Sequence, residues 1–263
     1  MTHVAETTPT HTFTPDLAVW RVRKPVIAAI VFALGGLLLT AIGSATGQVT
    51  TQVAGLDTAS ATLLTAAFVG VSALVGLAVM KRSPASLAAY GFRPVRNADK
   101  ALWFLPLAVL PVMGVVVGGI QVTPVQALAY AALAIAIGFS EEIWYRGLVQ
   151  AVLRPLGTRR AAVWGSVLFG VMHLANALSG TRPPLYLVLQ VVFAALTGFV
   201  LAELVILTGS LWPGIVWHLA YDLVGFSSGG DPLSTVALAG SMVEAAIVTA
   251  YAVWLWRRLP AEL

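Results

Sequence analysis

Residues 138–147 read Gly-Phe-Ser-Glu-Glu-Ile-Trp-Tyr-Arg-Gly and place three charged side chains inside an apolar run that extends from Thr123 to Leu153. The run is long enough to cross a bilayer as one helix, and a charge at that depth is costly and usually functional. Glu142 and Arg146 are four residues apart and share a helix face, so they can neutralise each other. Glu141 points roughly a quarter turn away and has no obvious local partner. A structural ion pair beside a protonated neighbour stays open as the alternative interpretation.

The composition indicates a polytopic helical membrane protein. The chain has 263 residues, of which 59% are hydrophobic and only 10% are charged, and its mean hydropathy is +0.89. Soluble domains of this length do not have such a balance. Cysteine is absent, which excludes disulfides, iron–sulfur clusters and a cysteine nucleophile and leaves His, Asp and Glu as metal ligands. The net charge of +4 does not suggest nucleic acid as a partner.

Eight apolar runs predict an all-α bundle of about eight transmembrane helices, embedded in a lipid bilayer. The runs are Val26–Thr46, Ala61–Met80, Ala101–Gln121, Thr123–Leu153, Ala161–Leu178, Leu185–Leu207, Leu211–Phe226 and Thr235–Trp256. They form one domain, residues 25–263, after a tail of residues 1–24. The tail has no apolar periodicity, and we expect it to be disordered.

The basic residues predict the orientation of the bundle. Thirteen of the fifteen Lys and Arg residues precede the first run, fill the second and fourth connections or follow the eighth run, whereas Arg182 alone lies on the opposite side. The positive-inside rule therefore places both termini in the cytoplasm. Arg far exceeds Lys, and Ala, Val and Gly are abundant. This composition fits a GC-rich bacterial genome, so we expect a bacterial plasma membrane.

Two histidines, His173 and His218, also lie within apolar runs. His218 shares a helix face with Asp222. At about 1.5 Å per residue, Glu141, His173 and His218 fall in the same cytoplasmic half of the bilayer. We therefore expect the three side chains to converge on a polar cavity that opens to the cytoplasm.

Three aromatic side chains are expected to contact the substrate of such a site. Trp144 and Trp217 each lie beside a charged or imidazole group inside a run, and Phe169 shares a helix face with His173. Glu203 is a different case, because it lies one turn from the cytoplasmic end of its run. We expect the Glu203 carboxylate to extend to the membrane interface.

Three of these patterns resemble, in order, the motifs of the CPBP intramembrane proteases, the family of the CAAX prenyl endopeptidases and bacterial Abi-type proteins. They are Glu141-Glu142-x-x-x-Arg146, Phe169-x-x-x-His173 and His218-x-x-x-Asp222. Residues 90–93, Tyr-Gly-Phe-Arg, and residues 208–213, Thr-Gly-Ser-Leu-Trp-Pro, are similar to further segments of the family, so the resemblance covers residues 90–222. Each motif is weak alone, but three in order within apolar runs are specific.

The resemblance implies endopeptidase cleavage of a membrane-associated peptide or protein. Glu141 would be the general base that deprotonates a water molecule, and His173 would help to hold that water. His218 and Asp222 would stabilise the oxyanion, while Glu142 and Arg146 would form a supporting pair. Family members carry Asn or Asp at position 222, and Asp222 would either be protonated or orient His218. Helical spacing alone leaves open which of the two glutamates is the base.

Metal dependence also stays open. His173, His218 and Glu141 would make a zinc site with one open position, and the family is often labelled metalloprotease. The His-Glu-x-x-His helix of zincins is missing, however, and the resemblance also supports a metal-free, glutamate-activated water, which we favour.

Two other functions stay open as alternatives to an endopeptidase. One is a proton- or cation-coupled transporter, which the lack of an internal repeat disfavours. The other is a non-catalytic membrane protein of the bacteriocin-immunity type.

Overall fold

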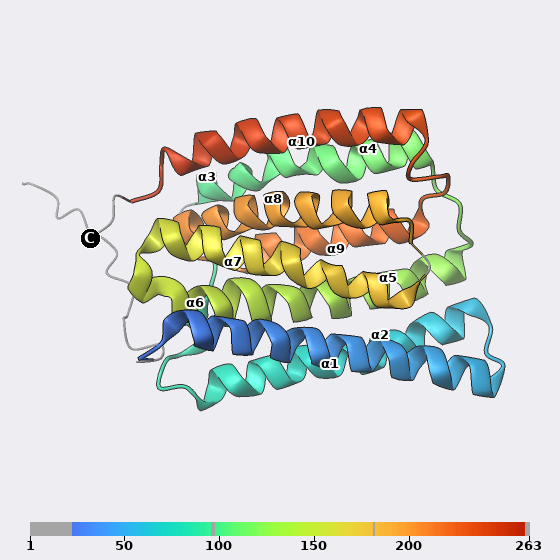
Figure 1. Ribbon diagram of the computed structural model, residues 1–263, viewed down its shortest axis with the longest axis horizontal. Helices are drawn as coiled ribbons and strands as arrows, with labels where there is room; N and C mark the ends of the chain where they lie inside the picture. Colours follow the sequence, from blue (N-terminus) through green and yellow to red (C-terminus); the bar gives the residue numbers. More distant parts are fainter. Residues whose placement is uncertain (1–22, 96–97, 181, 261–263) are drawn as a thin grey trace, which may run out of the picture.

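The computed structural model describes residues 23–95, 98–180 and 182–260. The regular structure of these residues is entirely helical, and the long helices lie side by side with their axes roughly parallel (Figure 1). The predicted all-α bundle of a polytopic membrane protein is therefore confirmed. Most of the predicted N-terminal tail, residues 1–22, lies outside the described residues.

The helices follow the predicted apolar runs closely, and the largest difference is that the first helix is longer at its C-terminal end. The α-helices are α1 (Pro25–Ala54), α2 (Thr58–Arg82), α3 (Ala98–Ala101), α4 (Val109–Gly118), α5 (Pro124–Glu141), α6 (Gln150–Leu153), α7 (Thr158–Met172), α8 (Pro184–Thr208), α9 (Trp212–Ser227) and α10 (Thr235–Trp256). The 3₁₀ segments are η1 (Leu87–Tyr90), η2 (Leu102–Ala108), η4 (Arg154–Leu156) and η5 (His173–Ser179). The remaining segment, η3 (Glu142–Val149), is π-helical.

Seven helical stretches of the described chain are long and apolar enough to cross a membrane. The eighth predicted run, Leu211–Phe226, forms α9, which has 16 residues. At about 1.5 Å per residue α9 is roughly 24 Å long, less than the ~30 Å hydrocarbon core of a typical bilayer. It packs against α4, α5 and α8 within the bundle.

The bundle has α1 and α2 along one side and α4 and α10 along the other, with α5 to α9 between them (Figure 1). The α1–α2 pair is close because small residues face the contact. A Cβ atom added at Gly43 would lie only 2.8 Å from the Phe68 carbonyl oxygen. All the predicted catalytic residues lie on the central helices, from α5 to α9.

One end of the bundle carries most of the described basic residues. The start of α1, the end of α2, the α6–α7 connection and the end of α10 all lie at this end, on the left in Figure 1. Their basic residues are Lys24, Lys81, Arg82, Arg154, Arg159, Arg160, Arg257 and Arg258. Arg182 precedes α8 at the opposite end. The structure thus shows the charge asymmetry, while the cytoplasmic location of this end stays a prediction.

Candidate active site

The helix that carries the two adjacent glutamates changes its hydrogen-bonding pattern at that point. α5 begins with a capping box, in which the Thr123 side chain accepts from the Gln126 N–H and the Gln126 side chain accepts from the Thr123 N–H. From Glu142 to Val149 the backbone is π-helical, a rare pattern that is frequent at functional sites. All eight residues of η3 are buried, because α1, α2, α7 and α8 pack around the segment.

Glu142 is completely buried and binds two partners through one oxygen. Its Oε1 lies 3.1 Å from Nη1 of Arg146 and 3.0 Å from Nδ1 of His218. The carboxylate can only accept, so the ring of His218 donates from Nδ1. The spacing of Glu142 and Arg146 predicts their ion pair, whereas the contact from Glu142 to His218 on α9 connects two elements that are distant in sequence.

The other nitrogen of His218 faces two further carboxylates. Nε2 lies 3.5 Å from Oε2 of Glu141 and 3.7 Å from Oδ2 of Asp222. Both carboxylate side chains remain partly accessible, 20% for Glu141 and 17% for Asp222. Three acidic side chains therefore surround one imidazole, and the Arg146 guanidinium lies beside Glu142.

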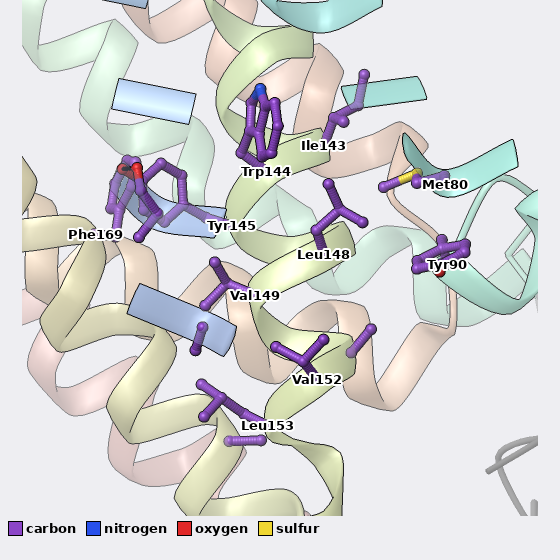
Figure 2. Packing of buried hydrophobic residues seen from close by; sticks show 14 of the residues in the cluster. Met80, Tyr90, Ile143, Trp144, Tyr145, Leu148, Val149, Val152, Leu153 and Phe169 are labelled. Atoms are coloured by element: carbon purple, nitrogen blue, oxygen red, sulfur yellow. Dashed lines mark hydrogen bonds between the residues drawn. The ribbon is translucent and has the colours of Figure 1, made fainter. Parts of the chain in front are cut away.

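Phe169 fills the space between the basic groups of the cluster. The Arg146 guanidinium lies over its ring at 4.1 Å from the centroid, and the rings of His173 and His218 lie 4.8 Å and 6.4 Å from it. Figure 2 shows Phe169 beside Tyr145, with the two ring centroids 4.9 Å apart. Phe169 is only 5% exposed, so its observed contacts are those of a packing residue at the centre of the site.

His173 is the first residue after α7 and is half-buried. Its Nδ1 lies 2.9 Å from the carbonyl oxygen of Phe169. A carbonyl can only accept, so Nδ1 carries the proton and Nε2 of the neutral ring is left as an acceptor. His173 thus contacts Phe169, and Phe169 in turn contacts Arg146 and His218.

The two predicted tryptophans lie in different surroundings. Trp217 is next to His218 in sequence, stacks on Tyr221 at 5.3 Å and donates from Nε1 to the Leu107 carbonyl at 2.8 Å. Trp144 instead donates from Nε1 to the carbonyl and hydroxyl oxygens of Ser72 on α2, at 3.2 and 3.1 Å. The structure therefore brings Phe169 and Trp217 to the site but places Trp144 against α1 and α2.

Two residues of the site were not predicted from the sequence. Tyr145 packs on Phe169, and Gly198, the single glycine of α8, faces the Arg146–Phe169 contact. A Cβ atom at Gly198 would lie 2.8 Å from Cδ1 of Phe169 and 3.1 Å from Nη2 of Arg146. A lone glycine in an otherwise bulky apolar helix was the available indication, since it permits a close approach.

The predicted zinc ligands do not form a metal site in this structure. In the described part of the chain, no three His, Cys, Asp or Glu side chains are grouped so that they could hold a metal ion. Nδ1 of His218 is already bound to Glu142, and Nδ1 of His173 is bound to the Phe169 carbonyl. The residues present therefore do not fit a centre made of His173, His218 and Glu141.

Comparison with known proteins yields a match for the segment that builds this site. A family model described as type II CAAX prenyl endopeptidase Rce1-like matches residues 123–224. No curated protein and no solved structure matches the chain. The matched segment begins at the residue that caps α5 and ends within α9. It contains all six predicted catalytic residues, whereas the predicted upstream motif at residues 90–93 lies outside it.

Proposed function

We propose, from the premise that residues 123–224 are of the type II CAAX prenyl endopeptidase Rce1-like family, that this protein is an intramembrane endopeptidase. Its substrate would be a membrane-associated peptide or protein. One observation carries the proposal: the two adjacent glutamates have different surroundings. Glu142 is completely buried and paired, whereas the Glu141 side chain is 20% exposed and faces His218.

Glu141 would act as the general base. A general base has to reach a water molecule, and Glu141 is the more accessible of the two adjacent carboxylates. It would take a proton from the water as the oxygen bonds to the carbonyl carbon of the substrate. Glu141 would then pass that proton to the leaving nitrogen as the C–N bond breaks. The products are a new carboxyl terminus and a new amino terminus.

His218 would stabilise the negative charge on the carbonyl oxygen. Its Nδ1 donates to Glu142, which fixes the ring and leaves Nε2 on the side of Glu141. A doubly protonated His218 would donate from Nε2 to the oxyanion, and one such donor contributes about 3 kcal/mol. Asp222 would orient the same ring from one turn further along α9. Arg146 would hold Glu142, and so keep His218 in place.

His173 would help to hold the attacking water. Its Nδ1 is used by the Phe169 carbonyl, so Nε2 can accept a hydrogen bond from that water. Every step above uses side chains of this chain alone. The metal content of the purified protein tests whether a metal ion is bound as an additional Lewis acid. The metal-free mechanism predicts that a chelator leaves the rate of cleavage unchanged.

The test compares new peptide termini in membranes of cells that express the wild type, Glu141→Gln or Glu244→Gln at equal levels. Glu244 is the matched control, because it is a half-buried glutamate of α10 outside the cluster. Specific termini should fall by about 100-fold in Glu141→Gln, as expected when a general base is removed, and persist in Glu244→Gln. Identical profiles with folded Glu141→Gln protein would contradict the proposal and favour transport or immunity.

A further inference from the structure

Three hydroxyl groups, two of them completely buried, form a cluster where α5 meets α1 and α2. It consists of Thr40 on α1, Ser72 on α2 and Ser140 on α5. Thr40 Oγ1 donates to Ser72 Oγ at 3.2 Å, Ser140 Oγ donates to Ser72 Oγ at 2.8 Å, and Thr40 Oγ1 lies 3.2 Å from Ser140 Oγ. Ser72 and Ser140 are completely buried. In an apolar interior such hydroxyl groups hold neighbouring helices together.

The same serine on α2 also holds the π-helical segment. Trp144 Nε1 lies within 3.1 Å of the Ser72 hydroxyl oxygen, and Figure 2 shows Trp144 pointing away from the Tyr145–Phe169 pair. Ser140 and Trp144 are four residues apart, one before and one after the two glutamates. Ser72 thus binds the helix at two points that bracket Glu141 and Glu142.

This double attachment restricts rotation of the helix about its own axis. Successive residues of an α-helix are about 100° apart around the axis, so a helix held at Ser140 on the α2 side turns Glu141 away from α2. Glu141 then faces α9, where its Oε2 lies 3.5 Å from Nε2 of His218. α1 also packs tightly against the π-helical segment, because a Cβ atom added at Gly36 would lie 2.6 Å from Cγ of Trp144.

We infer that the hydroxyl cluster of Thr40, Ser72 and Ser140, together with Trp144, sets the direction of the Glu141 carboxylate. These four are then positioning residues for the proposed general base. This inference rests on the proposed function. It assigns a role to the α1–α2 pair, which otherwise contributes no side chain to the site. It also gives Trp144 a role in place of substrate contact.

A cross-linking experiment tests the position of residue 141 without requiring hydrolysis. The natural chain has no cysteine, so Glu141→Cys and His218→Cys can be combined and their cross-linking yield measured with a short thiol-reactive reagent. Thr40→Val removes the hydroxyl group at nearly constant volume, and Thr40→Ser keeps it. Ser166→Ala is the matched control, because among the described residues the buried Ser166 hydroxyl bonds only within α7, to the Ala162 carbonyl at 2.7 Å.

The yield should fall at least threefold with Thr40→Val or Ser140→Ala and stay unchanged with Thr40→Ser or Ser166→Ala. Equal yields in all four backgrounds would overturn the inference, whether or not the protein cleaves peptides. With Glu141 and His218 restored, Thr40→Val should lower kcat roughly tenfold or more at unchanged KM, because small misplacements of a catalytic group are costly. Thr40→Ser should recover the rate. A loss that only follows the amount of folded protein would also contradict the inference.

Discussion

Glu142 in η3 and Glu203 in α8 are both completely buried, yet their surroundings are opposite. Glu142 contacts Arg146 and His218. Neither oxygen of Glu203 has a hydrogen-bond partner among the described residues. The expectation that Glu203 extends to the membrane interface is wrong, because α8 is covered by α7 and α10. Burial alone therefore does not identify the site; a buried carboxylate with basic partners on two helices does.

The largest effect is expected from making the same substitution at both positions. Glu142→Gln leaves the buried Arg146 without its counter-charge, and breaking a buried pair from one side costs about 3–5 kcal/mol. Glu203→Gln removes no partner, so the free energy of unfolding should change by less than about 1 kcal/mol. Unfolding of the purified proteins in detergent measures both. Equal losses would show that Glu142 and Glu203 are equivalent and that the pairing contributes nothing.

A smaller effect is expected from crowding the partners of Glu142 without altering a charge. Gly198→Ala would place a Cβ atom 2.8 Å from Phe169, and overpacking of this kind costs about 1–3 kcal/mol. The matched control is Gly70→Ala in α2, where a Cβ atom would meet nothing within 4 Å. That change should be neutral or stabilise by roughly 0.5–1 kcal/mol, since alanine is the better helix former. Both are measured by thermal unfolding, and a neutral Gly198→Ala would contradict the close packing around Arg146.

The smallest effect concerns a carboxylate outside the membrane-spanning helices. Asp57 caps α2: its side chain accepts from the Ser60 hydroxyl at 2.7 Å and from the Ser60 and Ala59 N–H groups. These bonds, the Ser60 hydroxyl first, hold the pKa of Asp57 below its usual value. A lowered pKa stabilises the folded state above the unfolded pKa of about 4, and the contribution is lost as the pH falls through the folded value.

The wild type should therefore lose more thermal stability between pH 6 and pH 3 than Asp57→Asn, which keeps an oxygen acceptor at the cap but does not titrate there. Thermal unfolding at the two pH values checks this. An identical loss in both proteins would show that the cap is not the group responsible.

The fold was largely predictable, because apolar runs and helix length are local properties. The run Thr235–Trp256 forms α10 with the same bounds. The members of the site were predictable as polar residues inside apolar runs, and so was the Glu142–Arg146 pair. The contact from Glu142 to His218 was not, because helical spacing does not show which face of α5 meets α9. The Ser72–Trp144 bond was missed for the same reason, since it connects helices that are distant in the sequence.

The central claim is that the two adjacent glutamates divide the work, with Glu141 as the base and Glu142 as the support of Arg146 and His218. The most direct measurement takes two quantities from one purified sample of each variant, Glu141→Gln and Glu142→Gln. These are the rate of cleavage and the midpoint of unfolding. The substrate is one that has been identified from its new termini. Glu141→Gln should lose at least about 100-fold in rate at an unchanged midpoint, and Glu142→Gln should lose stability. If Glu141→Gln keeps its rate while Glu142→Gln loses it at full stability, the assignment is contradicted.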